Sequence, residues 1–483
     1  MSSSPRAPVI VWFRQDLRLS DNPALEAARQ TGQAVLPLFI LDDETPGQWR
    51  RGGASRWWLH HSLAALSGAL EAIGSCLLLR RGPAGAVLKA LIEETGATAV
   101  FWNRCYEPFH CERDKSIKAE LSSSGLDVQS FNASLLAEPW TVRNKSGDPF
   151  RVFSPFWRNI RSELDPGYPL KAPEHLPSPA EWPAGDPLKS WNLLPHNPDW
   201  AEGFNTVWTP GEAGARKRLE DFLASGARQY AGGRDRPDKP YTSGLSPHLH
   251  FGEVSPRQIV SATESVRDDI GDRNAEKFLS ELGWREFAYS LLFNFPDLPE
   301  ANYQAKFDRF PWREDSAALK AWQRGQTGYP MVDAGMRELW ATGWMHNRVR
   351  MITASFLIKH LMIDWREGEK WFWDTLVDAD LANNSASWQW VAGSGADAAP
   401  YFRIFNPVTQ GEKFDPDGDY IRKWVPELAR LPGKYLNQPW NAGPLILKEA
   451  GIELGKTYPA PIIDHKAARE RALAAFQSLK ETA

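Results

Sequence analysis

Five short apolar runs, separated by stretches of helical periodicity, dominate the first 131 residues of the chain. Short apolar runs bounded by turn residues are typical of strands that a parallel sheet buries on both faces. A stretch such as DNPALEAARQTG, with Pro23 near its start and Gly32 at its end, predicts a helix between two strands. The alternation predicts an α/β N-terminal domain over residues 1–135, built on a five-stranded, doubly wound parallel sheet. We expect the strands at VIVWF (9–13), AVLPLFIL (34–41), CLLLRR (76–81), AVFWN (99–103) and DVQSF (127–131).

The first expected strand is not followed by a phosphate-binding glycine loop. WFRQDLRLSDN stands there, and it contains neither GxGxxG nor GxxxxGKS/T. The sequence therefore argues against a conventional dinucleotide or nucleoside-triphosphate site on this sheet.

The chain changes character over residues 136–204. Nine prolines fall between Pro166 and Pro198 with little periodicity, which predicts an extended interdomain connector. From residue 205 to residue 483 the apolar residues recur at helical spacing, and we expect a large all-α domain there. Within it, SPHLHFG and SPRQIVSA each begin with Ser-Pro, a capping residue followed by the favoured first-turn proline.

Cysteine usage and charge exclude several classes of protein. Cys76, Cys105 and Cys111 are the only cysteines, which fits a reducing cytoplasm and cannot form a four-cysteine metal cluster. We expect no metal site. The chain starts without an apolar signal core, and no apolar run is long enough to span a bilayer. Because the net charge is −4, a nucleic-acid partner would need a local basic patch.

Tryptophan is the unusual residue of this composition, with 23 in the chain. A core seldom needs so many, because each buried indole N–H requires a hydrogen-bond partner. Stacking on bases, sugar binding and electron relay are the alternatives that this surplus leaves open.

Two segments place polar groups where a ligand could bind. In RQYAGGRDRPDKPYTSGLSPHLHFG (228–252), Thr242, Ser243 and Ser246 offer hydroxyl and backbone N–H groups in a glycine-containing turn before a helix, which suits an anion. The alternative is an ordinary capped helix start. In ELGWREF (281–287), Glu281 and Trp284 share a helix face and could line a pocket. The alternative there is an exposed pair between Glu281 and Arg285.

A third segment, WMHNRVRM (344–351), is basic. Asn347 and Arg350 fall on one side of the expected helix, and Arg348 and Met351 fall on another. The alternative is a solvated basic face.

The fourth segment, DADLANNSASWQW (378–390), combines carboxylates with indoles. A carboxylate in a dry pocket is costly unless a cation pairs with it, and Arg350 is our candidate partner for Asp378 and Asp380. The alternative is a helix through SASWQWVAG that Asn383 or Asn384 caps, with its tryptophans facing the core.

Four of these segments together resemble the photolyase/cryptochrome family. They are WFRQDLRLSDNPAL, YTSGLSPHLHFGEVSP, WMHNRVRM and DADLANNSASWQWVAGSGADAAPYFRIFNPVTQGEKFDPDGDYIRKWVPEL. The resemblance covers nearly the whole chain. It implies an α/β domain joined to a helical domain that holds FAD in a U-shaped conformation.

The resemblance assigns flavin contacts to residues of this chain. Asn384 matches the side chain that faces flavin N5, Asp380 would accept hydrogen bonds from the ring, and Asp378 would pair with Arg350 beside it. The remaining FAD contacts are implied at Tyr230, Thr242, Ser243, Leu245, Ser246 and Asn347.

The resemblance also assigns an electron relay and a lesion pocket. Trp388 matches the indole nearest the flavin, and Trp365 and Trp312 match the next two indoles towards the surface. Members that repair cyclobutane pyrimidine dimers surround the lesion with residues that match Glu281, Trp284, Trp390, Asn347 and Met351.

Two positions separate the branches of the family. The (6-4) photolyases carry histidine where Met351 stands. Plant cryptochromes usually carry aspartate where Asn384 stands. They also add a long C-terminal extension, whereas this sequence ends at residue 483. We therefore expect light-driven repair of cyclobutane dimers, in a chain similar to the bacterial class III branch. A blue-light photoreceptor is the alternative, and a member specific for single strands is a weaker one.

The resemblance implies UV-damaged DNA as the partner of a monomeric, cytoplasmic protein that joins the nucleoid when bound to DNA. Arg234, Arg348 and Arg403 match positions that contact DNA phosphates. Methenyltetrahydrofolate is the expected antenna chromophore, with a deazaflavin as the alternative. Folate-binding members have an asparagine-glutamate pair after the fourth strand, whereas this chain has Phe109 and His110 there, with Glu107 nearby.

Overall fold

A computed structural model describes residues 7–164 and 167–481 of the chain. The chain forms two compact units: unit 1 comprises Met1–Arg228 and Ser243–Pro296, and unit 2 comprises Gln229–Thr242 and Asp297–Ala483. Residues 1–6 of the expected N-terminal domain and residues 165–166 of the expected connector, Pro166 included, lie outside the described residues. The units do not divide at residues 135 and 204, so the three expected segments stay a prediction.

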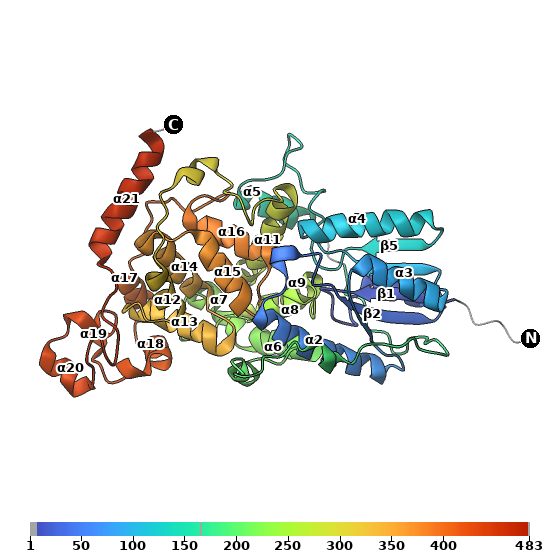
Figure 1. Ribbon diagram of the computed structural model, residues 1–483, viewed down its shortest axis with the longest axis horizontal. Coiled ribbons are helices and arrows are strands. Elements are labelled where there is room, and N and C mark those ends of the chain that lie inside the picture. Colours follow the sequence, from blue (N-terminus) through green and yellow to red (C-terminus); the bar gives the residue numbers. More distant parts are fainter. Residues whose placement is uncertain (1–6, 165–166, 482–483) are drawn as a thin grey trace, which may run out of the picture. The chain divides into compact units, whose positions relative to one another are not determined.

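Unit 1 contains the predicted parallel sheet (Figure 1). Its strand order is β3-β2-β1-β4-β5, and every neighbouring pair is parallel. The prediction of five strands is confirmed at each expected run, because an apolar run between turn residues is a local signal. The strands are β1 (Val9–Phe13), β2 (Val35–Leu41), β3 (Leu78–Arg81), β4 (Ala99–Asn103) and β5 (Asp127–Phe131).

Helices cover both faces of this sheet. The chain steps outward from β1 to β3 and then, in the other direction, from β4 to β5, so right-handed crossovers place the first two helices and the next two on opposite faces. On one face, Leu88 and Leu91 of the third helix and Leu121 of the fourth pack with Ile10 and Trp12 of β1 in one apolar cluster. These helices are α1 (Pro23–Gln30), α2 (Gly53–Ala72), α3 (Ala84–Thr95) and α4 (Pro108–Ser123).

The rest of unit 1 consists of helices and irregular segments. The segment expected as a connector, residues 136–204, contains the helix Phe153–Glu163 and is extended only in part. Between residues 167 and 187 the described chain contains no helix or strand. Ser255 caps its helix as predicted and forms a capping box with Gln258. The helices are α5 (Phe153–Glu163), α6 (Glu212–Ala224), α8 (Ser246–His250), α9 (Pro256–Ser265), α10 (Arg267–Ile270) and α11 (Asp272–Asn294).

Unit 2 is all-α in its described residues, which confirms the prediction of a helical domain after the sheet. Its apolar core runs from Trp322 to Tyr458, and a π-helical segment, Phe356–Leu361, follows one of its helices directly. The helices are α7 (Tyr230–Gly233), α12 (Ser316–Gln323), α13 (Pro330–Thr342), α14 (Asn347–Ser355), α15 (Trp365–Thr375), α16 (Leu381–Ala392), α17 (Pro407–Phe414), α18 (Asp419–Trp424), α19 (Gly433–Leu436), α20 (Pro444–Ala450) and α21 (His465–Glu481).

Candidate functional site

Arg350 of α14 and Asp378, three residues before α16, form an ion pair in unit 2. Nη2 of Arg350 lies 2.8 and 3.1 Å from the two carboxylate oxygens of Asp378, and Nε donates to the carbonyl oxygen of Met345 at 2.7 Å. The Asp378 side chain is only 3% exposed, so the guanidinium offsets a charge that would otherwise be costly to bury. The candidate pairing of Arg350 with Asp378 is confirmed, and a freely solvated face is wrong for this arginine.

Asp380 caps α16. Its side chain accepts from the backbone N–H of Asn383 at 2.9 Å, and the helix begins at the next residue. The alternative that Asn383 or Asn384 caps a helix is therefore wrong, because the side chain of Asp380 accepts from a free N–H group at the start of this helix.

Asn384 is buried and held from one side. Its amide nitrogen donates to the carbonyl oxygen of Glu369 at 3.1 Å. Because that neighbour can only accept, the side-chain oxygen must point the other way. Among the residues that the structure describes, this oxygen makes no hydrogen bond with protein. An amide fixed at one end and open at the other suits a ring that offers it an N–H group, so the donor set fits a flavin here.

Glu369 of α15 is the residue whose backbone carbonyl accepts from this amide. One carboxyl oxygen accepts from Ser385 Oγ at 2.5 Å, and the other is buried without a partner among the described groups. Burial raises the pKa of Glu369 to about 8, so the carboxyl is neutral near pH 7. The sequence analysis missed this residue, since nothing in WREGEKW separates it from Glu367, which is exposed two residues earlier.

The three relay tryptophans lie in unit 2. Trp388 and Trp365 are 2% and 0% exposed, and Trp312 is half-buried. Gly368 makes room for Trp388, since a Cβ atom at that position would lie 2.1 Å from the indole. Two buried indoles and one half-buried indole are what a relay between core and surface needs. The relay itself stays a prediction.

Glu281 and Trp284 project from α11 in unit 1. The Glu281 carboxylate lies 3.2 Å from Nζ of Lys277, and the indole of Trp284 stacks on Phe153 with ring centroids 3.7 Å apart. Arg285 is buried and donates to a backbone carbonyl at 2.7 Å, so the alternative of an exposed Glu281–Arg285 pair is wrong.

Asn347, Met351 and Trp390 belong to unit 2. Asn347 is exposed at the first residue of α14, whereas Met351 and Trp390 are half-buried. Accessible side chains of these three kinds suit contacts with a ligand, and their role in a lesion pocket stays a prediction.

Two of the predicted DNA-contacting arginines meet in unit 2. Arg348 and Arg403 line one cavity of about 350 Å³, here called the basic pocket, and Lys413 lines it as well. Arg348 is anchored by Asp235, whose carboxylate lies 3.0 Å from Nη2. The sequence analysis missed Asp235 and Lys413, because a charge in a loop or on a short helix carries no sign of its distant neighbours. The full lining is Asp235, Arg348, Arg403, Ile404, Phe405, Asn406, Thr409, Gln410, Lys413 and Phe414.

The predicted anion cradle spans the passage of the chain from one unit to the other. Of its residues, Thr242 belongs to unit 2, whereas Ser243 and Ser246 belong to unit 1. The other two predicted FAD contacts of this segment, Tyr230 and Leu245, belong to unit 2 and unit 1, respectively. Arg234, a predicted DNA contact, belongs to unit 2. Ser246 is the first residue of α8 and does not cap it, since Leu245 stands at the cap position. The capping alternative is therefore wrong for this serine. The cradle stays a prediction.

Phe109 and His110, which stand where folate-binding members have their asparagine-glutamate pair, lie in the first turn of α4 and not in the loop after β4. Glu107 is buried, accepts from Nε2 of Gln15 at 2.6 Å and lies 3.1 Å from Nδ1 of His110. The histidine and these hydrogen bonds outweigh burial and hold the pKa of Glu107 well below its usual range. Cys105 lies within reach of the same two side chains, but burial raises the pKa of its thiol to about 12. A protonated thiol is poorly prepared to bind a metal ion.

No helix within the described residues is both long and apolar enough to cross a bilayer.

Residues 9–180 match the family model described as DNA photolyase, and residues 278–478 match the one described as FAD binding domain of DNA photolyase.

Individual proteins match over almost the full chain. A deoxyribodipyrimidine photo-lyase from Agrobacterium fabrum is 56% identical and covers 99% of both chains. Cryptochrome-1 from Arabidopsis thaliana is 42% identical over 96% of this chain and 69% of its own. The crystal structure of a bacterial class III photolyase from Agrobacterium tumefaciens has a TM-score of 0.97 and 55% identity, covering 100% of this chain and 99% of that one.

The sheet, the helical unit with its buried Arg350–Asp378 pair, and these full-length matches lead to one conclusion. The chain belongs to the photolyase/cryptochrome family and carries the FAD-binding domain of that family.

Proposed function

We propose that this chain is a light-driven DNA-repair enzyme, a deoxyribodipyrimidine photo-lyase that splits cyclobutane pyrimidine dimers. The observation that carries the proposal is the 56% identity to the Agrobacterium fabrum photo-lyase over 99% of both chains. Met351 and Asn384 support it, because both match the repair branch rather than the (6-4) or plant cryptochrome branches.

The proposed cofactor is FAD in its reduced form. Bound reduced FAD would supply, on excitation, the electron that opens the cyclobutane ring and that returns when repair is complete. Asn384 would bond flavin N5 through its open side-chain oxygen, and the Arg350–Asp378 pair would lie beside the ring. The other proposed FAD contacts are Tyr230, Thr242, Ser243, Leu245, Ser246, Asn347 and Asp380.

The lesion would be flipped out of the duplex and held by side chains of this chain. Trp284 and Trp390 would pack against its apolar faces, and Asn347 and Met351 would complete the pocket. Glu281 would hydrogen-bond to a base and stabilise the negative charge that develops on the dimer. In the free protein Glu281 pairs with Lys277, so binding would exchange one partner for another.

Trp388, Trp365 and Trp312 would carry electrons between the core and the surface when the flavin is reduced by light. The indole suits this task because it can lose an electron reversibly. DNA would be bound through phosphates by Arg234, Arg348 and Arg403, and we propose that the chain acts as a monomer on the bacterial nucleoid.

Methenyltetrahydrofolate is the proposed antenna, with a deazaflavin as the alternative. Phe109 and His110 stand where folate-binding members have the asparagine-glutamate pair, and His110 lies 3.1 Å from the Glu107 carboxylate, so a folate would need other contacts. Extraction of the chromophore from purified protein and its absorption spectrum would identify it.

A blue-light photoreceptor is the second candidate. The 42% identity to Cryptochrome-1 of Arabidopsis thaliana favours it, and both functions would use the same flavin and relay. A receptor would show flavin photoreduction without repair, whereas an enzyme would show both.

The proposal is tested by repair of a thymine-dimer oligonucleotide under blue light and in the dark. We expect light-dependent repair by the reduced holoprotein. Glu281→Ala should repair at least ~10-fold more slowly, because it loses a hydrogen bond made in the transition state. Lys277→Ala is the matched control, since it removes the partner of Glu281 and keeps the carboxylate. Equal repair by wild type and Glu281→Ala would contradict the role of Glu281, and no repair by wild type would contradict the enzyme.

A further inference from the structure

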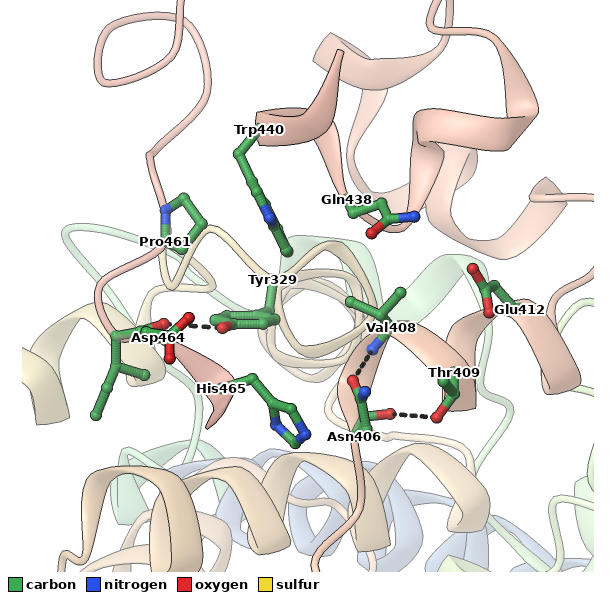
Figure 2. Close-up of a pocket in the computed structure, with 11 residues that line it drawn as sticks. Tyr329, Asn406, Val408, Thr409, Glu412, Gln438, Trp440, Pro461, Asp464 and His465 are labelled. Carbon is green, nitrogen blue, oxygen red and sulfur yellow. Dashed lines mark hydrogen bonds between the residues drawn. The ribbon is translucent and has the colours of Figure 1, made fainter. Parts of the chain in front are cut away.

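Unit 2 contains a cavity with an excess of negative charge. It has a volume of about 520 Å³ and surrounds Tyr329, Glu412, Trp440 and Asp464, and we call it the acidic pocket (Figure 2). The described residues that line it include two carboxylates, those of Glu412 and Asp464, and no lysine or arginine. Neither carboxylate forms an ion pair with another described residue. The pocket therefore offers two uncompensated negative charges in a volume that suits a small molecule.

The histidine and the tyrosine of the acidic pocket add no charge near neutral pH. Burial and the neighbouring Arg469 lower the pKa of His465, and its Nδ1 lies 2.8 Å from Nε2 of the buried His360. Burial raises the pKa of Tyr329 to about 12, and the Tyr329 hydroxyl donates to the carbonyl oxygen of Ile463 at 2.8 Å. The charge of the pocket is therefore that of its two carboxylates.

The two carboxylates lie apart, with aromatic rings between them. Figure 2 shows Asp464 and Glu412 on opposite sides of Tyr329. The rings of Tyr329 and Trp440 meet edge to face, with centroids 5.2 Å apart. Glu412, Asp464 and His465 are not among the described groups whose ligand atoms all lie within 4.8 Å of one another, so a single metal ion could not bind all three. A cationic ligand of this pocket must instead carry two charges that are separated by an apolar spacer.

We propose that the acidic pocket binds a linear aliphatic polyamine, with one ammonium group at Glu412 and another at Asp464. Each ammonium group forms charge-assisted hydrogen bonds with its carboxylate. The methylene chain between them packs against the rings of Tyr329 and Trp440, and the negative ring faces attract the adjacent cationic groups. This inference goes beyond the proposed function, because its ligand is neither a flavin nor DNA.

Equilibrium dialysis of the holoprotein against radiolabelled spermidine, without DNA and at low salt, tests this inference. We expect one saturable site per chain. Putrescine and butylamine have the same four-carbon chain and differ by one ammonium group. Butylamine should compete about 5-fold less well than putrescine, because it leaves one carboxylate without a partner. No saturable binding of spermidine, or equal competition by the two amines, would overturn the inference.

Two substitutions identify the site. Glu412→Gln and Asp464→Asn should each weaken spermidine binding by about 5-fold and reduce the preference for putrescine over butylamine. Asp464→Asn keeps a side-chain oxygen that can accept from the backbone N–H of Ala467, which Asp464 binds at 2.8 Å, so the start of α21 is retained.

Glu449→Gln is the matched control. Glu449 is an exposed glutamate of α20 in the same unit, and it does not line the acidic pocket. This variant should bind spermidine as the wild type does. If Glu412→Gln and Asp464→Asn bind spermidine as tightly as Glu449→Gln, the polyamine lies elsewhere on the protein and the inference is overturned.

Discussion

At the scale of single residues, both units contain buried carboxyl groups with a raised pKa. Burial raises the pKa of Glu286 and of Glu338 to about 7, and that of Glu369 to about 8. Glu286 and Glu338 accept hydrogen bonds from backbone N–H groups, whereas Glu369 keeps one oxygen without a partner. Burial therefore favours the protonated form of Glu369, whose backbone carbonyl accepts from the amide proposed to face flavin N5.

This predicts how stability depends on pH. The pKa of Glu369 is raised from 4.5 to about 8, so between these two values the folded state binds more protons than the unfolded state. The contribution of Glu369 to the free energy of unfolding therefore falls as pH rises through this window, by on the order of a few kcal/mol. Outside the window this contribution is constant. Glu369→Gln cannot ionise at this position. Its free energy of unfolding should therefore fall less than that of the wild type when the pH is raised from 5 to 8.

Denaturant midpoints of the apoprotein at the two pH values measure the effect. Glu367→Gln, on the exposed side of the same helix, is the control and should follow the wild type. The same loss of stability in Glu369→Gln and wild type would contradict a neutral Glu369.

At the scale of elements, the Ser-Pro pair before α9 is a strong start signal. Ser255 accepts from the backbone N–H of Gln258 at 3.0 Å and donates to Asp21 at 2.5 Å. Ser255→Ala should therefore cost about 1–2 kcal/mol of unfolding free energy. Ser154→Ala, an exposed serine in the first turn of α5, should change it by less than ~0.5 kcal/mol. Equal effects of the two substitutions would show that the capping box contributes nothing.

The elements also show what local sequence can predict. All five strands were predictable, because each is a short apolar run between turn residues. The cap of α16 was not predictable from the sequence. Asp380, Asn383 and Asn384 are all residue types that favour the cap position, and only the backbone conformation in the structure shows that Asp380 precedes the helix. The same holds for Ser246, where an identical Ser-Pro signal falls inside the helix instead of before it.

At the scale of the whole molecule, the division into units was not predictable. The chain enters unit 2 at Gln229, returns to unit 1 at Ser243 and leaves it again after Pro296. Such crossings depend on contacts between residues far apart in sequence, and no local pattern reports them. A buried carboxylate needs a cation nearby, which made Arg350 a candidate partner for Asp378 and Asp380, and the resemblance to the family singled out Asp378. The basic pocket, built from residues 235 to 414, gave no comparable signal.

The most direct test of the central claim is the number of dimers repaired for each bound FAD under continuous blue light, with the flavin redox state followed in the same sample. Because the electron returns after each ring opening, we expect many repaired dimers per flavin, none in the dark, and no consumption of reductant in proportion to repair. A protein that binds and photoreduces FAD but leaves the dimers intact would contradict the account and leave the photoreceptor as the function of this chain.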